Sequence, residues 1–175
     1  MHAAGVPAEV PMKFVCTLLV VEDIARARAF YETVLGQTVK FDFGDNVTFA
    51  GDFAIHRKSH YRGLIGDLEV ARGRNDVELY FEYDDVEAME KRLDGQAVRF
   101  LHKTREQPWR QRVLRVYDPD GYIVEIGESL GHLCYRLSLD GIAEPEIAET
   151  VGIPEGMVRE GIARYGASKQ RGVEQ

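Results

Sequence analysis

The amino-acid sequence predicts an α+β fold in which two paired βαβββ modules form a curved mixed sheet around a concave cavity, followed by a C-terminal helical appendage. The first observation behind this prediction is an internal repeat, which constrains the architecture before any local pattern does. Each copy runs from a strand through a helix ending in Gly-Gln and on to Val-Lys-Phe or Val-Arg-Phe, at residues 17–41 and 78–100. The second observation is that strand patterning stops near residue 128 and helical spacing replaces it. Two copies are too few for a solenoid, so we expect two halves packed around a shared centre.

The first module begins with an apolar, β-branched strand over residues 13–21. Glu22 and Asp23 then place negative charge at the start of a helix, where the helix dipole favours it. That helix ends at Gly36, since glycine tolerates a left-handed conformation. Its expected buried stripe, at helical spacing, is Ile24, Ala27, Tyr31, Val34 and Leu35. Short strands follow near 38–43, 46–50 and 53–57, and the glycines and charges of residues 58–75 predict a loop.

The second module repeats this order. A strand over 77–83 precedes a helix that opens at Asp84-Asp85, and strands follow near 97–104, 111–117 and 122–127. Between the last two strands, Asp118-Pro119-Asp120-Gly121 predicts a tight turn, because proline presets one dihedral angle and glycine accepts a positive one. We therefore expect a domain over 12–128, built from modules 12–57 and 76–128.

Residues 129–175 predict a helical C-terminal extension, with helices near 129–139, 146–152 and 154–165. Residues 147–158 have the alanine and glycine spacing of a helix-turn-helix, which is one reading of the extension; a small helical cap or dimer arm is the other. Acidic residues outnumber basic ones in this segment. A recognition helix needs basic phosphate contacts nearby, so the charge favours the cap.

Composition excludes several classes of function. With 175 residues, 45% of them hydrophobic and 29% charged, the chain has the make-up of a soluble globular protein. No apolar run approaches the roughly 20 residues that cross a bilayer, and residues 1–12 lack the regions of a signal peptide. The two distant cysteines predict no disulfide framework and favour the reducing cytoplasm. A net charge of −7 argues against nucleic acid or an anionic membrane as partner.

Four potential metal ligands fall at related places in the two copies. Matching Asp23 to Asp85 sets Cys16 opposite Glu78, and matching the last strands of the modules sets His56 opposite Glu125. If a pseudo-twofold axis relates the halves, these four side chains converge. The alternative is that the cysteine is a small buried apolar residue, the histidine lies on a strand surface and the glutamates lie on solvated sheet edges. Without a metal, two facing glutamates would repel, and one should carry a proton near neutral pH.

Two segments carry a resemblance to a known family. Residues 19–36, with Leu-Val-Val-Glu-Asp-Ile leading to Phe-Tyr and Leu-Gly, and residues 117–125, Tyr-Asp-Pro-Asp-Gly-Tyr-Ile-Val-Glu, resemble the vicinal oxygen chelate superfamily. That superfamily includes glyoxalase I, ring-cleaving dioxygenases and bleomycin-binding resistance proteins. The resemblance covers about residues 12–128 and looks like a glyoxalase-like branch with a helical extension. It implies paired βαβββ modules, a metal on the concave face and, commonly, a homodimer.

The chain also departs from the superfamily's pattern. Cys16 and Glu78 stand where many members have histidine, so the two-histidine, one-carboxylate set of iron oxygenases cannot be assembled and extradiol dioxygenase chemistry is disfavoured. Glu125 agrees with the family's last ligand position and His56 lies near the remaining one. A mixed set of Cys16, His56, Glu78 and Glu125 would suit a divalent ion such as Zn, Ni, Mn or Fe.

Two classes of function follow from the resemblance. One is a metal-dependent isomerase or lyase of the glyoxalase type acting on a small oxygenated metabolite, with Glu78 or Glu125 as the catalytic base. The other is a metal-free, non-catalytic protein that binds a small molecule, as bleomycin-resistance proteins do. In either class, Tyr80, Trp109 and Arg112 are the candidate substrate-binding residues around the cavity.

Overall fold

The computed structural model describes residues 14–71 and 75–173, which divide into two compact units, one reaching Val70 and one starting at Ala71. Each unit is described by itself. The predicted starts of the first strand at residue 13 and of the domain at residue 12 lie outside the described residues. The α+β prediction is confirmed: among the described residues there are two mixed four-stranded sheets, one per module, and the helices α1 to α6.

The first unit follows the βαβββ order that the repeat predicts. Its strands are β1 (Thr17–Val21), β2 (Val39–Asp42), β3 (Asn46–Phe49) and β4 (Phe53–Arg57), in the sheet order β1-β4-β3-β2. β1 runs parallel to β4, and the other pairs are antiparallel. The helix between β1 and β2 starts as α1 (Ile24–Arg28) and continues as the π-helical turn η1 (Ala29–Val34). Asp23 caps it by accepting a hydrogen bond from the Arg26 backbone N–H at 3.0 Å.

Aromatic packing holds the helix of the first unit on its sheet. Tyr31 of η1 is fully buried, and its ring centroid lies 5.6 Å from that of Phe49 and 5.1 Å from that of Phe53. One expectation for this unit was wrong: α2 (Lys58–Leu64) occupies part of the stretch predicted as a loop. None of the residues of α2 is buried, so the helix has no apolar stripe for periodicity to detect.

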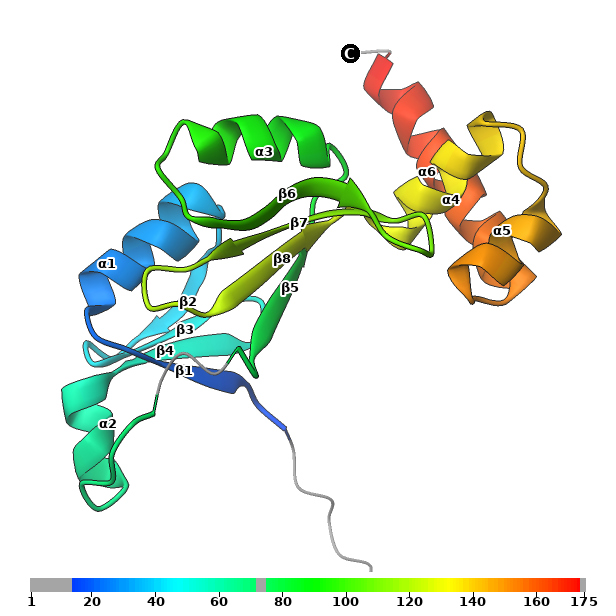
Figure 1. Ribbon diagram of the computed structural model, residues 1–175. Helices are drawn as coiled ribbons and strands as arrows, with labels where there is room; N and C mark the ends of the chain where they lie inside the picture. Colours follow the sequence, from blue (N-terminus) through cyan, green and yellow to red (C-terminus); the bar gives the residue numbers. More distant parts are fainter. Residues whose placement is uncertain (1–13, 72–74, 174–175) are drawn as a thin grey trace, which may run out of the picture. The chain divides into compact units, whose positions relative to one another are not determined.

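The second unit repeats the arrangement. Its strands β5 (Glu78–Glu82), β6 (Phe100–Glu106), β7 (Arg112–Tyr117) and β8 (Ile123–Gly127) lie in the order β5-β8-β7-β6, with β5 parallel to β8. Helix α3 (Val86–Asp94) crosses one face of this sheet (Figure 1). Asp85 caps α3 as Asp23 caps α1, which supports the alignment of the two copies. Gly121 of the predicted turn has a φ of 91°.

Three helices follow the second sheet and belong to the same unit: α4 (Leu130–Leu139), α5 (Glu144–Val151) and α6 (Glu155–Val173). Their core is the buried set Leu133, Cys134, Leu137, Ile147 and Val158. Gly152, with φ of 76°, ends α5 in the left-handed conformation. Helix α6 runs further than the predicted 154–165. The division of the chain at residue 128 stays a prediction.

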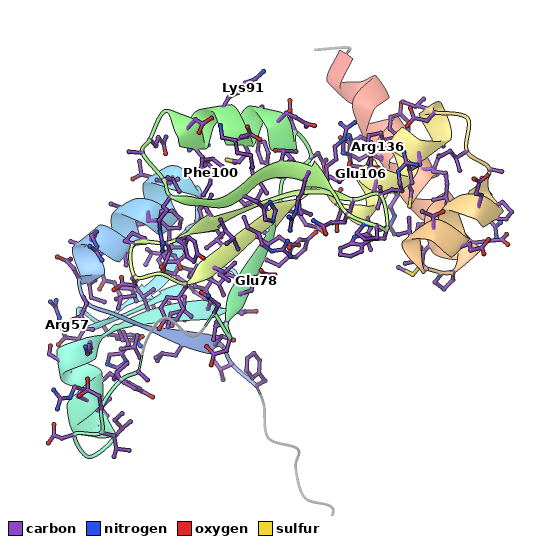
Figure 2. All side chains as sticks on the ribbon, in the orientation of Figure 1. Arg57, Glu78, Lys91, Phe100, Glu106 and Arg136 are labelled. Atoms are coloured by element: carbon purple, nitrogen blue, oxygen red, sulfur yellow. The ribbon has the colours of Figure 1, made fainter. Side chains whose placement is uncertain are left out.

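A buried ion-pair cluster ties α4 to the sheet. Glu128, directly after β8, is fully buried. Its carboxylate accepts hydrogen bonds from Arg136 on α4, from Nη2 at 2.6 Å and from Nε at 3.1 Å. His132 Nδ1 lies 2.8 Å from the same carboxylate. Arg136 also reaches Glu106 at the end of β6, at 3.8 Å, and the two lie close together in Figure 2. Arg136 therefore joins α4 to the end of β6 and to the residue that follows β8.

None of the described helices is long and apolar enough to span a lipid bilayer.

Candidate functional site

The second sheet has two distinct faces. Side chains alternate along a strand, and Leu114, Val116, Val124 and Ile126, all 0–1% exposed, belong to the set that packs with α3. The alternate residues lie on the opposite face, which we call the far face. Its members on the strands are Glu78, Tyr80, Glu82, Val113, Arg115, Tyr117, Ile123, Glu125 and Gly127. Several of the predicted site residues therefore share one surface.

Arg115 lies between the two glutamates that the sequence singles out. Its Nε donates to Glu78 Oε2 at 2.8 Å, and its Nη2 is ion-paired with Glu125. Glu125 is only 7% exposed, so its charge depends on this partner. Sequence reasoning expected the two carboxylates to face each other and repel. The structure corrects that expectation, because one guanidinium bridges both.

His102 of β6 completes this cluster. Arg115 Nη1 lies 3.2 Å from His102 Nε2, and because a guanidinium only donates hydrogen bonds, Nε2 must be the acceptor. The other ring nitrogen, Nδ1, lies 2.9 Å from the backbone oxygen of Lys103 and so carries the proton. The far face carries three carboxylates, those of Glu78, Glu82 and Glu125. Against them stand Arg115, Arg105, which lies opposite Val113, and Arg99, whose guanidinium lies 3.6 Å from the centre of the Tyr117 ring.

A second group on the far face is a hydrogen-bonded chain of three side chains. Gln111 Nε2 donates to Tyr80 Oη at 3.0 Å, and the Trp109 indole N–H donates to Gln111 Oε1 at 2.9 Å. Gln111 is 7% exposed, whereas Tyr80 is 48% exposed and Trp109 39%. Burial and the nearby negative charge of Glu82 raise the pKa of Tyr80. The two predicted aromatic residues are thus joined through a residue that sequence reasoning missed.

The third predicted substrate-binding residue lies elsewhere. Arg112 is out of phase with Arg115 along β7 and pairs with Glu87 of α3, Nη1 to Oε1, at 3.2 Å. The structure therefore groups Tyr80 and Trp109 but does not place Arg112 with them.

In the first unit, the strand register separates Cys16 from His56. β1 pairs with β4 so that Val20 lies opposite His56. Cys16 precedes Val20 by four residues, which at roughly 3.3 Å per residue is about 13 Å along the strand. A metal ligand lies about 2.0–2.3 Å from its ion, so these two side chains are not brought together within the unit.

The registers also revise the match between the two copies. In the second sheet Tyr80 lies opposite Glu125, and in the first sheet the matching residue, Leu18, lies opposite Ala54. Ala54, not His56, therefore occupies the place of Glu125. His56 lies two residues further along β4, where its Nδ1 is 3.1 Å from Asn46 Nδ2.

His56 belongs to a small polar cluster of its own. Its Nε2 lies 2.7 Å from His60 Nδ1, and its ring packs edge-on against Tyr61 with centroids 5.6 Å apart. His56 is 6% exposed. Burial, followed by the positive charge of His60, lowers the pKa of His56. The neutral form is therefore the one that the folded unit favours.

The donor residues present in each unit do not fit a resident divalent metal ion. In the part of the chain that the structure describes, no three or more His, Cys, Asp or Glu side chains gather closely enough to hold one. In the second unit the carboxylates of Glu78 and Glu125 are bound to Arg115, and a metal would have to displace that guanidinium or share the carboxylates with it. In the first unit the position matching Glu125 is an alanine, which has no donor atom.

Comparison with known proteins identifies the family. A family model described as a glyoxalase-like domain matches residues 14–131, well over half of the chain. The chain therefore belongs to the glyoxalase-like family, within the vicinal oxygen chelate superfamily. The resemblance drawn from the sequence is confirmed.

Solved structures agree with this assignment. A protein of unknown function from Agrobacterium tumefaciens strain C58 is 38% identical, with a TM-score of 0.63, and the match covers 70% of this chain and 98% of that one. A glyoxalase/bleomycin resistance protein/dioxygenase from Nocardioides is 21% identical (TM-score 0.57, covering 70% and 87%), and a lactoylglutathione lyase from Agrobacterium tumefaciens is 22% identical (TM-score 0.50, covering 69% and 96%). At these identities, the Nocardioides protein and the lactoylglutathione lyase show only that the fold is shared. Among curated proteins, none matches the chain.

Proposed function

We propose that the chain is a small-molecule-binding protein that holds an oxygenated organic ligand on the far face of the second sheet without a resident metal ion. The observation that supports this most is the position of Arg115. Superfamily members typically use a divalent ion at the cavity, and here a protein guanidinium is bound to the two carboxylates that would ligate it. The aromatic pair Tyr80 and Trp109 supplies the ring surfaces that small-molecule sites commonly use.

The polar groups of the far face suit a ligand that both donates and accepts hydrogen bonds. The carboxylates of Glu78 and Glu125 accept, whereas the Tyr80 hydroxyl can donate. Arg115 holds Glu78 through charge-assisted hydrogen bonds, which are roughly twice as strong as neutral ones, and Glu125 through an ion pair. Such a preorganised set lowers the entropy cost of binding. The homodimer that the family resemblance implies belongs to this proposal, and the protein's mass in solution tests it.

A metal-dependent isomerase or lyase is the second candidate, and one observation favours it. Glu78 and Glu125 project from the same face of neighbouring strands, as two ligands of one ion would. In this candidate, Glu78 or Glu125 moves the proton. The candidate requires Arg115 to leave one of the carboxylates.

Elemental analysis of the protein purified without added metal separates the two candidates. The binder contains less than about 0.1 equivalent of Zn, Ni, Mn or Fe and takes up none when these ions are offered, because Arg115 is ion-paired with both carboxylates. The controls are Glu78→Ala and Glu125→Ala on the far face and Glu87→Ala on α3. If the wild type holds about one equivalent that the first two variants lose and the third retains, the binder proposal is wrong and the enzyme takes its place.

A further inference from the structure

We propose that Gln111 is a positioning residue that commits the Tyr80 hydroxyl to donate its proton to an acceptor oxygen of the ligand. The ligand class that this selects is a flat, uncharged molecule bearing a carbonyl oxygen, such as an aromatic ketone or amide. The inference rests on the proposed function, because it assigns a role at the same site.

The orientation of the Gln111 amide is fixed from both ends. Its Nε2 donates to the backbone oxygen of Glu128 at 2.8 Å, and that oxygen can only accept. Its Oε1 accepts from the Trp109 indole N–H at 2.9 Å, and that N–H can only donate. Turning the amide over would set donor against donor and acceptor against acceptor. The remaining N–H of Gln111 therefore has to donate to Tyr80 Oη, at 3.0 Å.

This polarity decides what Tyr80 offers to a ligand. Because its oxygen already accepts from Gln111, its own O–H is left to donate, and a ligand oxygen has to take the place of the carboxylate with which this hydroxyl interacts in the protein. Within the protein, the carboxylate of Glu82 is the neighbour that interacts with this hydroxyl. Burial and the charge of Glu82 raise the pKa of Tyr80, so the hydroxyl keeps its proton at neutral pH. Tyr80 therefore presents a proton and selects an acceptor.

The neighbouring groups narrow the ligand further. Trp109 has already used its only polar group on Gln111, so its ring contributes a flat surface. The carboxylates whose charge acts on Tyr80, those of Glu82 and Glu128, repel a ligand carboxylate at this hydroxyl. A neutral carbonyl on a planar molecule meets both conditions. Close packing keeps the Tyr80 ring in place, since a Cβ at Gly127 would lie 3.2 Å from Tyr80 Cε2 and from Gln111 Nε2.

The chain contains a single tryptophan, so a ¹H–¹⁵N spectrum has one indole signal, that of Trp109. The probe is acetophenone, a flat neutral ketone, titrated while this signal is followed. Benzylamine, a flat cation without an acceptor, is the matched probe for the carboxylates. We expect acetophenone to shift the signal saturably in the wild type.

Three variants test the role of Gln111. Tyr80→Phe removes the donor. Gln111→Glu keeps the size of the side chain but leaves it only acceptors, so the Tyr80 proton turns inward. Gln111→Met keeps a side chain of similar size without polar atoms. It replaces Gln111→Glu in the test if the carboxylate buried by that substitution prevents folding. Each should weaken acetophenone binding at least about fivefold, the order of one hydrogen bond, and weaken benzylamine binding less, because benzylamine has no acceptor for the Tyr80 proton.

A readout independent of any ligand separates positioning from simple loss of packing. The phenolate absorbance of the wild type minus that of Tyr80→Phe isolates the ionisation of Tyr80. Because the Gln111 N–H stabilises the phenolate, Gln111→Met should raise the pKa of Tyr80 further. Equal acetophenone affinity in all variants, with an unmoved Tyr80 ionisation, overturns the inference and leaves the binding proposal standing. If neither probe shifts the indole signal saturably in the wild type, the proposed function itself fails.

Discussion

Removing one side of the buried Glu128–Arg136 ion pair should destabilise the second unit strongly. The substitution is Arg136→Met, which keeps the length and apolar stem of the side chain and removes the charge. Glu128 is fully buried, and the Arg136 side chain is 13% exposed, so water does not replace the lost partner. The glutamate keeps the backbone N–H of Arg112 at 2.9 Å and the His132 ring at 2.8 Å.

Breaking a buried pair on one side costs about 3–5 kcal/mol, and the remaining hydrogen bond from the Arg112 N–H, with the nearby His132 ring, places this case near the lower end, at about 3 kcal/mol. For a protein of this size, a loss of about 3 kcal/mol lowers the melting temperature by roughly 6–12 °C. The double variant Arg136→Met with Glu128→Gln should recover part of the loss, because it no longer buries an unpaired charge.

Urea unfolding measures the effect, followed by circular dichroism and by the fluorescence of Trp109, which lies in the same unit. The control is Arg164→Met, whose side chain is 80% exposed and pairs with Glu160 on α6 at 2.6 Å. Exposed pairs contribute at most about 1 kcal/mol, so this variant should unfold almost as the wild type does. Equal losses in the two variants would refute the reasoning, since burial would then not determine the strength of the pair.

Three further predictions concern local features. Asp85→Ala removes the cap of α3 and should cost about 1 kcal/mol in urea unfolding, whereas Asp85→Asn should retain most of the stability. Burial and the charge of His60 lower the pKa of His56 below 6.5, so the unfolded chain binds more protons and stability falls as the pH drops below about 6.5. His56→Gln should reduce this fall, seen as a smaller shift of the urea midpoint between pH 7.5 and 5.5; an unchanged shift contradicts the assignment. Gly127→Ala places a methyl group 3.1–3.2 Å from its neighbours and should cost about 1–3 kcal/mol and displace Tyr80, visible as altered phenolate titration.

The fold was predictable because the two copies repeat the same local chemistry. Asp23 and Asp85 both cap a helix. Of the stripe predicted after Asp23, Ile24, Ala27 and Tyr31 are buried, whereas Val34 and Leu35 are half-buried. The second helix of the first unit was not predictable in this way. Its residues stay at the surface, so no alternation of apolar and polar positions marks it.

The site was predictable only in part. Glu78 and Glu125 share a face because strand alternation follows from the backbone alone. The mismatch at His56 arises because strand register depends on hydrogen bonding and on loop lengths, which differ between the copies. The sequence did contain an indication of Arg115 that the prediction missed. A charged residue among Val113, Leu114 and Val116 needs a carboxylate nearby, and in the structure Glu125 lies opposite it.

Residue 128 has a consequence for how the protein can be dissected. The main-chain oxygen of Glu128 accepts a hydrogen bond from Gln111, which contacts Tyr80. Its carboxylate accepts one from Arg136 of α4. A shortened protein that ends at Ser129 would expose the Glu128 carboxylate without its Arg136 partner, and this residue also holds Gln111, which contacts Tyr80 and Trp109. Domain-trimming experiments should therefore retain α4.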